Sequence, residues 1–337
     1  MATADVTVMG AGIFGLSVAY ACACRGAIVR VIDPHGVAAG SSGGVVGALA
    51  PHVPENWNEK KAFQFDSLMM AASFWAEVES LTGADVGYAR SGRLQPLADD
   101  HAVQLARARA VSAAKLWEGQ AVWEVRPADD ERWMPPSPTG LVVHDTLSAL
   151  IHPRRATQAL ADAVVALGGA VVTDGPEDGA VVWATGWPGV QEIGGGGVKG
   201  QAALLRYDAA GQPQLFADAL HIIPHADGTV AIGSTSERVF EDPVAPDAAL
   251  DVVIARALSA FPVLADAEVV ARWAGVRPRS KSRAPVLGVH PLRAGQFIAN
   301  GGFKIGFGMA PKVGVVMADL LLEGCDLIPA GFKASQS

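Results

Sequence analysis

Three glycines near the start of the chain have the spacing of a phosphate-binding turn. Gly10, Gly12 and Gly15 follow the apolar run at residues 6–9 and precede a helix-like stretch at residues 16–24. Such a triplet lets a strand turn tightly into a helix, lets a pyrophosphate approach the backbone, and lets helix and sheet pack closely. The first amides of the helix are then available to a phosphate. The spacing therefore predicts dinucleotide binding.

An acidic residue stands where such a turn needs one. Asp33 ends a second strand-like run at residues 28–32, about twenty residues after the turn, where a carboxylate can accept hydrogen bonds from a ribose diol. No arginine follows it to hold a 2'-phosphate. Glycine makes up 38 of 337 residues, so a chance glycine-rich βαβ turn is the alternative, and the complete order of strand, turn, helix, strand and acid argues against it.

Composition limits the class of protein. Half of the 337 residues are hydrophobic, which is enough for two domains with sizeable cores. The net charge of -8 and the pI near 5.5 argue against binding to nucleic acid. The chain shows no secretory signal pattern and no apolar run of roughly eighteen residues, so we expect a cytoplasmic protein without membrane insertion. Its three cysteines lack metal-ligand spacing, so we expect no metal site and no disulfides, and treat them as small core residues.

The organisation of the chain predicts one domain built from separated segments and a second domain inserted between them. Glycine-punctuated β-rich runs suggest an antiparallel sheet in the inserted domain; they cover residues 92–97, 198–207, 220–224 and 229–234. Helices are expected at residues 58–82 and 156–167, a buried strand within residues 179–186, and a flexible joint at residues 194–197. Pro311 is expected to open a final helix at residues 312–322, and the chain is expected to fray from Pro329 on.

Further motifs follow in order along the chain. They are Ser41-Ser42, Gly47 to His52, Ala184-Thr185-Gly186, Lys199-Gly200-Gln201, Gly275 to Pro278, and Gly301 to Gly306 running into Ala310-Pro311. In this order they resemble the D-amino-acid oxidase family of flavoenzymes, most closely its glycine oxidase branch. The resemblance covers nearly the whole chain and implies FAD in place of NAD.

The resemblance also implies a fold. It is an α/β fold with a Rossmann-like FAD-binding domain and an inserted, mainly antiparallel α+β substrate domain. The FAD-binding domain would be discontinuous, with residues 1–82, 146–197 and 272–330, and the substrate domain would hold residues 83–145 and 198–271. The flavin ring would lie where the two domains meet.

Carried over residue by residue, the resemblance implies which residues hold FAD. The amides of Ile13 and Phe14 would face the pyrophosphate, Asp33 the adenosine ribose, and Ser41 and Ser42 the phosphates and ribityl chain. A helix beginning at Pro311 would aim its positive end at the flavin. The backbone contact to adenine falls in the shortened segment 172–181 and is not assigned. The full expected set is Gly10, Gly12, Ile13, Phe14, Gly15, Asp33, Pro34, Ser41, Ser42, Val46, Gly47, Ala48, Thr185, Gly186, Gly302, Phe303, Lys304, Ile305, Gly306, Phe307 and Gly308.

Three residues are expected to act on the substrate. The resemblance places Arg277 against a carboxylate, which a guanidinium can grip through two parallel hydrogen bonds; a structural ion pair within an arginine-rich run is the alternative. His221 stands at the family position of a pocket tyrosine, or is a satisfied core or surface histidine. Lys304 stands where the glycine oxidase branch has an arginine, and either bonds substrate or flavin or points to solvent.

The chain departs from the family pattern beside Arg277. Where the family has threonine-x-aspartate, this chain has residues 279–283 with Arg279, Lys281 and Arg283, so positive charge replaces an acid. We therefore expect a substrate larger or more acidic than glycine. Gly302 replaces a family histidine, which removes bulk near the flavin.

The function implied is oxidation of the C-N bond of glycine, a D-amino acid or an N-alkyl amino acid, by hydride transfer to flavin N5 and hydrolysis of the imine by water. The partners are then a small carboxylate-bearing substrate and an electron acceptor, oxygen or a quinone. Two alternatives stay open: a flavin-binding protein without amine turnover, and a dinucleotide-dependent hydroxy-acid dehydrogenase. The residues leave the substrate's side chain, its stereochemistry and the oligomeric state open, a homo-oligomer included.

Overall fold

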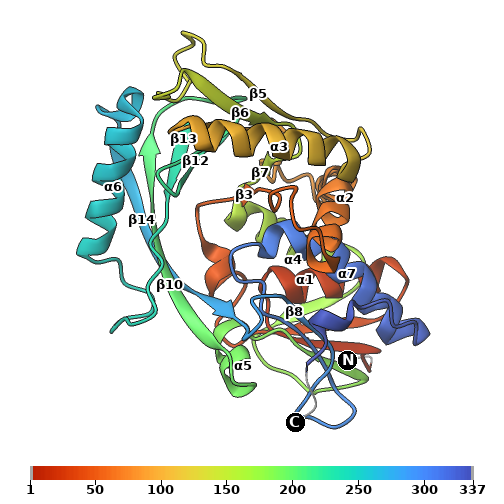
Figure 1. Ribbon diagram of the computed structural model, residues 1–337. Coiled ribbons are helices and arrows are strands. Elements are labelled where there is room, and N and C mark those ends of the chain that lie inside the picture. Colours follow the sequence, from red (N-terminus) through yellow and green to blue (C-terminus); the bar gives the residue numbers. More distant parts are fainter. Residues whose placement is uncertain (1–2, 335–337) are drawn as a thin grey trace.

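The computed structural model describes residues 3–334 and contains a largely parallel sheet of six strands (Figure 1). Their order is β15-β16-β9-β1-β2-β8, and every pairing except β15 with β16 is parallel. The strands are β1 (Val6–Met9), β2 (Val29–Ile32), β8 (Ala170–Val172), β9 (Ala180–Trp183), β15 (Val286–Val289) and β16 (Phe297–Asn300). Segments far apart in the sequence thus share one sheet, which confirms the expected Rossmann-like arrangement.

Helices pack together beside this sheet. Helix α1 contacts α4 and α7, and α2 contacts the same two helices. The Asn58 side chain caps α2 by accepting from the Lys61 amide, as the predicted boundary at residue 58 requires. Within α2, Phe63, Trp75 and Val78 are buried, whereas Leu81 is exposed. The bounds are α1 (Ile13–Cys24), α2 (Glu59–Thr82), α4 (Pro153–Ala166), α5 (Gly186–Glu192) and α7 (Gly306–Glu323).

The second sheet has eight strands in the order β14-β10-β13-β12-β11-β4-β6-β5. Every pairing is antiparallel except β4 with β11, so the expectation of a mainly antiparallel sheet is confirmed. In Figure 1 this sheet curves around the upper left of the molecule, with α6 (Ala248–Ala260) on its outer side and α3 (Asp100–Leu116) near β5 and β6. Its strands are β4 (Arg93–Pro96), β5 (Trp123–Pro127), β6 (Leu141–Asp145), β10 (Gly196–Arg206), β11 (Gln214–Ala217), β12 (Leu220–Pro224), β13 (Thr229–Gly233) and β14 (Glu268–Arg279).

The register of this sheet divides its side chains between two faces. Directly paired residues share a face, and residues two apart in a strand do the same. One face is apolar and packs with α6 in a common core, to which the strands contribute Leu94, Ala203, Leu215, Ile222 and Ile232. The alternate residues form the other face, here called the inner face. One row across it consists of Trp273, Ala202, Gly233, His221 and Phe216.

Several local expectations are wrong. Residues 196 and 197 of the expected flexible joint belong to β10, where they pair with Arg279 and Pro278, because edge pairing with β14 orders this glycine-rich segment. Cys24 and Cys325 are exposed, and only Cys22 is buried. The expected fraying from residue 329 on is wrong for Phe332, whose buried ring packs on Phe63; residues 335–337 lie outside the described part.

The remaining short elements are η1 (Ser41–Gly43), a two-stranded pair of β3 (Ala48–Leu49) with β7 (Ala149–Leu150), η2 (Pro262–Leu264) and η3 (Ala330–Phe332). Among residues 3–334, no helix has the length and apolar character needed to span a bilayer. The assignment of residue ranges to two domains stays a prediction. Strand β14 crosses the predicted boundary at residues 271 and 272, and β10 crosses that at 197 and 198.

Candidate functional site

The predicted cofactor residues gather at one edge of the six-stranded sheet. The turn at Gly10 follows β1, Asp33 follows β2, Thr185 follows β9 and Gly301 follows β16. Because these four strands are parallel, their carboxyl ends lie at the same edge. Ligands of open α/β sheets bind in the crevice outside that edge.

Two glycines of the turn have no room for a side chain. Gly10 has a φ of +118°, and a Cβ atom there would lie 2.4 Å from the Ala184 carbonyl oxygen. A Cβ atom on Gly15 would lie 2.0 Å from the carbonyl oxygen of Gly10. The glycine spacing therefore serves close packing of the turn against β9 and α1, as the sequence predicted.

The first helical amides and Asp33 are held by specific hydrogen bonds. The Ile13 N–H donates to the Ser42 hydroxyl (3.0 Å), whereas the Phe14 N–H has no partner among residues 3–334. Asp33 accepts from the amides of Ala11 (2.9 Å) and His35 (3.0 Å), which fixes the carboxylate beside the turn. Of the two predicted pyrophosphate amides, the one at Phe14 is free and the one at Ile13 is already bonded.

The shortened segment at residues 172–181 still reaches this place. Strand β8 pairs with β2, and the Asp33 amide donates to the Val172 carbonyl (3.0 Å). The backbone at residue 172 therefore adjoins the acid expected to hold the ribose. Pro34 follows Asp33 on the exposed side.

Residues 44–47, together called the interface loop, connect the two sheets. A Cβ atom on Gly44 would lie 3.3 Å from the Trp273 ring, and one on Gly233 would lie 2.9 Å from Val46 Cγ2. The Val45 carbonyl oxygen lies 2.9 Å from Nε2 of His225. Position 47 has no room for a side chain, because a Cβ atom on Gly47 would lie 1.7 Å from the Ile151 carbonyl oxygen.

The loop between β16 and α7 corrects one expectation. Helix α7 begins at Gly306, about 7.5 Å before Pro311 at ~1.5 Å per residue, so the prediction that Pro311 opens it is wrong. Gly306 and Gly308 are weak helix formers, but Gly308 lies against Leu68 of α2, so tertiary packing overrides propensity. The positive end of α7 thus lies closer to the Gly10 turn than predicted, and Gly302 lies against the Phe14 ring.

Arg277 extends from β14 across β10. A Cβ atom on Gly200 would lie 2.0–2.2 Å from the guanidinium atoms, so the guanidinium lies directly over that glycine. Arg277 donates to the Thr235 carbonyl (3.2 Å) and to the Ser234 hydroxyl, which uses two of its five N–H groups. Burial lowers the pKa of Arg277 to about 10, against the attraction of Glu237. No carboxylate of residues 3–334 forms an ion pair with it, so the structural ion-pair alternative is not supported.

A polar network behind Arg277 was missed by the sequence reasoning. Thr235 donates to the Glu237 carboxylate, and Gln201 donates to Glu237 (3.0 Å) and to Asp247 (2.7 Å). The buried Lys199 ammonium donates to Asp247 (2.8 Å). The network therefore holds Thr235, whose carbonyl accepts from Arg277, through Gln201 of β10 and Glu237. The nearest signal in the sequence was the polar Lys199-Gly200-Gln201 motif inside an apolar strand.

His221 lies on the inner face, with its ring 4.8 Å from that of Phe216. Burial lowers the pKa of His221 to about 3, and repulsion from Arg93, Lys304 and Arg277 adds to this. The imidazole is therefore neutral near pH 7. Its Nδ1 is buried and has no hydrogen-bond partner among residues 3–334, so the interpretation as a satisfied core histidine is not supported.

Lys304 lies near Arg277, and its loop is tied to β14. The Phe303 amide donates to the Pro278 carbonyl (3.2 Å), which brings residues 303–304 beside the end of β14. Partial burial, and then repulsion from Arg277, lowers the pKa of the Lys304 ammonium. Its residue remains exposed, so a contact with a ligand and a solvated position both stay open. Of the other cations expected beside the pocket, Lys281 and Arg283 are exposed and Arg279 is partly buried.

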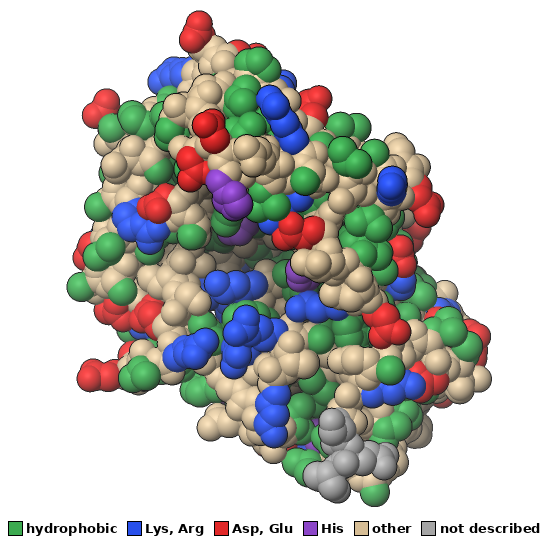
Figure 2. Space-filling model, viewed as in Figure 1, with side chains coloured by type: hydrophobic (Ala, Val, Ile, Leu, Met, Phe, Trp, Pro, Cys, Tyr) green, Lys and Arg blue, Asp and Glu red, His purple; other side chains and the backbone are tan. Residues whose placement is uncertain are grey.

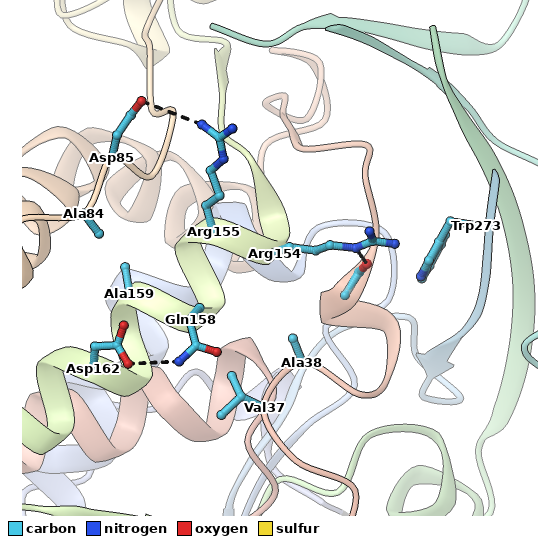
Figure 3. Close-up of a pocket in the computed structure, with 11 residues that line it drawn as sticks. Val37, Ala38, Ala84, Asp85, Arg154, Arg155, Gln158, Ala159, Asp162 and Trp273 are labelled. Carbon is cyan, nitrogen blue, oxygen red and sulfur yellow. Dashed lines mark hydrogen bonds and ion pairs between the residues drawn. The ribbon is translucent and has the colours of Figure 1, made fainter. Parts of the chain in front are cut away.

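A separate cavity of about 670 Å³ lies between α4 and the Trp273 ring (Figure 3). Its polar groups have partners: Arg154 donates to the Gly43 carbonyl (2.6 Å), Gln158 donates to Asp162 (2.9 Å), and Arg155 lies 3.8 Å from Asp85. Arg277, His221 and Lys304 do not line it. It borders the predicted cofactor cradle and is separate from the substrate residues.

The phosphate turn, the ribose acid and the sheet order together define a dinucleotide-binding oxidoreductase fold with a cationic pocket. Comparison with known proteins is more specific. The family model described as "FAD dependent oxidoreductase" (DAO) matches residues 5–320, and this chain belongs to that family. FAD is accordingly its cofactor, and the nicotinamide alternative is set aside.

Individual relatives agree. The chain is 25% identical over 351 residues to the bifunctional protein ThiO/ThiG of Nostoc sp., covering 95% of this chain and 53% of the relative, so it spans about half of that protein's length. It is 36% identical to glycine oxidase of Pseudomonas aeruginosa over 125 residues, which are 37% of this chain and 34% of the relative. The crystal structure of glycine oxidase from Geobacillus kaustophilus shares the fold, with a TM-score of 0.86 at 21% identity and 99% of both chains covered.

The residues at the carboxyl edge fit FAD. The free Phe14 amide at the start of α1 suits a phosphate, and the fixed Asp33 carboxylate suits a ribose diol. Gly302 lies against the Phe14 ring, and Gly44 of the interface loop lies against Trp273 of the inner face. Neither has a side chain that would obstruct a flavin there.

Proposed function

We propose that this chain oxidises the C-N bond of an amino acid and that Arg277 holds the substrate carboxylate. FAD, when bound, supplies the hydride acceptor for this chemistry. The electron acceptor that regenerates FAD is oxygen or a quinone. Glycine, D-amino acids and N-alkyl amino acids are the substrate classes to compare.

The observation that carries the proposal is a partly buried guanidinium without a carboxylate partner. Arg277 has three N–H groups beyond its two hydrogen bonds, and Gly200 beneath it fixes the plane of the guanidinium. A planar fork of this kind grips a carboxylate through two parallel bonds and so orients the carbon that loses hydride. A group gripped at Arg277 would lie between the inner face and the loop that carries Lys304.

His221 and Lys304 have supporting roles in this proposal. The neutral imidazole of His221 can accept a hydrogen bond at Nδ1, which suits a protonated or neutral amine. The Lys304 ammonium adds a second positive charge beside the carboxylate. Neither residue is required as a base, because a neutral amine can lose its α-hydrogen as hydride.

Anaerobic bleaching tests the proposal directly. Protein loaded with FAD is mixed with glycine, N-methylglycine and a panel of D-amino acids, and the flavin absorbance is followed. We expect at least one of them to bleach the flavin in wild type, and Arg277→Met to need much higher concentrations. Reduction by dithionite but by no amino acid in the panel would contradict the proposal and favour a flavin-binding protein without amine turnover.

A further inference from the structure

The inner face carries more positive charge than one carboxylate requires. Arg93, Lys304 and Arg277 all lie near enough to His221 to lower the pKa of its imidazole by repulsion. In Figure 2, Lys and Arg side chains gather along a hollow in the middle of the visible face, with His side chains above them. The proposed function employs Arg277 and leaves the purpose of Arg93 open.

The sheet register places Arg93 on the inner face. Arg93 in β4 pairs with Gln214 in β11, and Phe216, two residues further along β11, pairs with His221. Residues two apart share a face, so Arg93, Phe216 and His221 project from the same side of the sheet. The guanidinium carbon of Arg93 lies 5.9 Å from the ring centre of Phe216 and 5.9 Å from that of Trp123.

Arg93 is buried but incompletely bonded. Its exposed fraction is 6%, and its Nε lies 2.9 Å from a carboxylate oxygen of Asp145. That contact is not aligned as a hydrogen bond, and within residues 3–334 no nitrogen of Arg93 donates one. Asp145 meanwhile accepts from the Ser148 amide (2.8 Å) and hydroxyl (3.0 Å). An ion pair joining β4 to β6 thus leaves the terminal N–H groups of the arginine unused.

Donors on a guanidinium that have no protein partner must be satisfied by water or by a ligand. The Nδ1 atom of His221, on the far side of the Phe216 ring, is unpartnered as well. A cavity of about 240 Å³ lies beside Phe216 and is lined by Gln95, which shares a face with Arg93. This end of the inner face therefore has polar groups without partners, and the cavity beside it shares Phe216 with them, although Arg93 and His221 do not line that cavity.

We propose that Arg93 and His221 form a second subsite, which binds an acid group at the far end of the substrate, so that the substrate is a dicarboxylic amino acid. This inference rests on the proposed function, in which Arg277 holds the α-carboxylate. The guanidinium of Arg277 reaches across β10 towards β13, and Arg93 stands in β4 beyond His221. Two bound acid groups would lie on opposite sides of His221.

Binding of non-oxidisable acids separates this inference from the proposed function. Glutarate carries two carboxylates, and its monoamide, glutaramate, has the same length with one. Affinity for the FAD-loaded protein is measured by calorimetry. We expect glutarate to bind at least tenfold more tightly than glutaramate. Equal affinities would overturn the inference, whatever the enzyme oxidises.

Variants then assign the preference to Arg93. Replacing Arg93 alone leaves Asp145 buried without its counter-charge, so Arg93→Met is combined with Asp145→Asn to remove both charges. Arg206→Met is the control, because Arg206 forms an exposed ion pair with Glu268 at the other end of β10. We expect the double variant to bind glutarate and glutaramate within threefold of each other, and the control to keep the wild-type ratio. A ratio unchanged in a folded double variant would overturn the inference.

Turnover gives the second readout. Glutamate and glutamine, each as both enantiomers, differ in the same single charge. We expect kcat/KM for one enantiomer of glutamate to exceed that for the matching glutamine by at least tenfold. Glutamate bleaching the flavin no faster than glutamine, while neutral amino acids bleach it, would overturn the dicarboxylate assignment. If no amino acid is oxidised but the glutarate preference persists, the second subsite is supported and the proposed function fails.

Discussion

Replacing Arg277 by methionine separates a binding role from a structural one. The pKa of Arg277 falls from 12.5 to about 10 on burial, which at ~1.4 kcal/mol per unit means that holding the charge in place costs about 3.5 kcal/mol. Methionine removes this cost of holding the charge. It also removes two hydrogen bonds, to Thr235 and Ser234, each worth ~1–1.5 kcal/mol. The two effects largely cancel, so the free energy of unfolding is expected to change by no more than ~1.5 kcal/mol.

Substrate capture should respond very differently. Truncating one partner of a buried, hydrogen-bonded charge pair costs ~2–5 kcal/mol, so kcat/KM should fall by at least about 30-fold. Unfolding is followed in urea by circular dichroism, and kcat/KM by anaerobic flavin bleaching, on the same FAD-loaded preparations. Arg206→Met, which alters an exposed ion pair, is the matched control and should change neither quantity. A large loss of stability with unchanged kcat/KM would refute the binding role of Arg277.

Three further expectations follow from local geometry. Gly200→Ala would place Cβ 2.0 Å from the guanidinium of Arg277, so we expect that side chain to shift. A loss of ~1.4 kcal/mol in substrate binding lowers kcat/KM about tenfold, and we expect at least this effect with little loss of stability. Wild-type kinetics would contradict this. Burial lowers the pKa of His152 to about 4, below its unfolded value near 6.5. The unfolded chain therefore takes up a proton first, and stability should fall between pH 6.5 and 4 by up to ~1.4 kcal/mol per pH unit from this residue, with a shallower slope for His152→Asn in urea titrations. Gly10→Ala would set Cβ 2.4 Å from the Ala184 carbonyl oxygen at a φ of +118°, so we expect loss of FAD on gel filtration; full retention would show that the turn tolerates a side chain.

Local rules account for the parts of the site that were predicted correctly. The order β1, glycine turn, α1, β2 and Asp33 lies within residues 6–33, where turn geometry and strand register follow from neighbouring residues. The fold of the second sheet was predicted only as a set of strands. Its order places β4 beside β11, two strands more than a hundred residues apart, and no local pattern specifies such a pairing.

The missed residues follow from this limit. Arg93 lies near His221 only because β4 joins the sheet at β11, so its position in the four-residue strand β4 carried no hint of a ligand. Glu237, forty residues before Arg277 in the chain, accepts hydrogen bonds from Thr235 and Gln201, and the Thr235 carbonyl accepts one from Arg277. The start of α7 was misplaced because a local rule was applied where tertiary packing decides. Gly308 has low helix propensity, but its contact with Leu68 of α2 outweighs that propensity.

The interface loop makes the two halves of the site mechanically dependent on each other. Just before this loop, the Ser42 hydroxyl accepts a hydrogen bond from the first amide of α1, and within the loop Val46 and the Val45 carbonyl contact Gly233 and His225. A bound nucleotide that breaks or shortens the hydrogen bond between Ile13 and Ser42 would therefore shift the interface loop. That loop packs against the inner face, on which a substrate would lie. By thermodynamic reciprocity, if the bound prosthetic group raises the affinity of the site for an acid, the bound acid raises the affinity for the prosthetic group by the same factor.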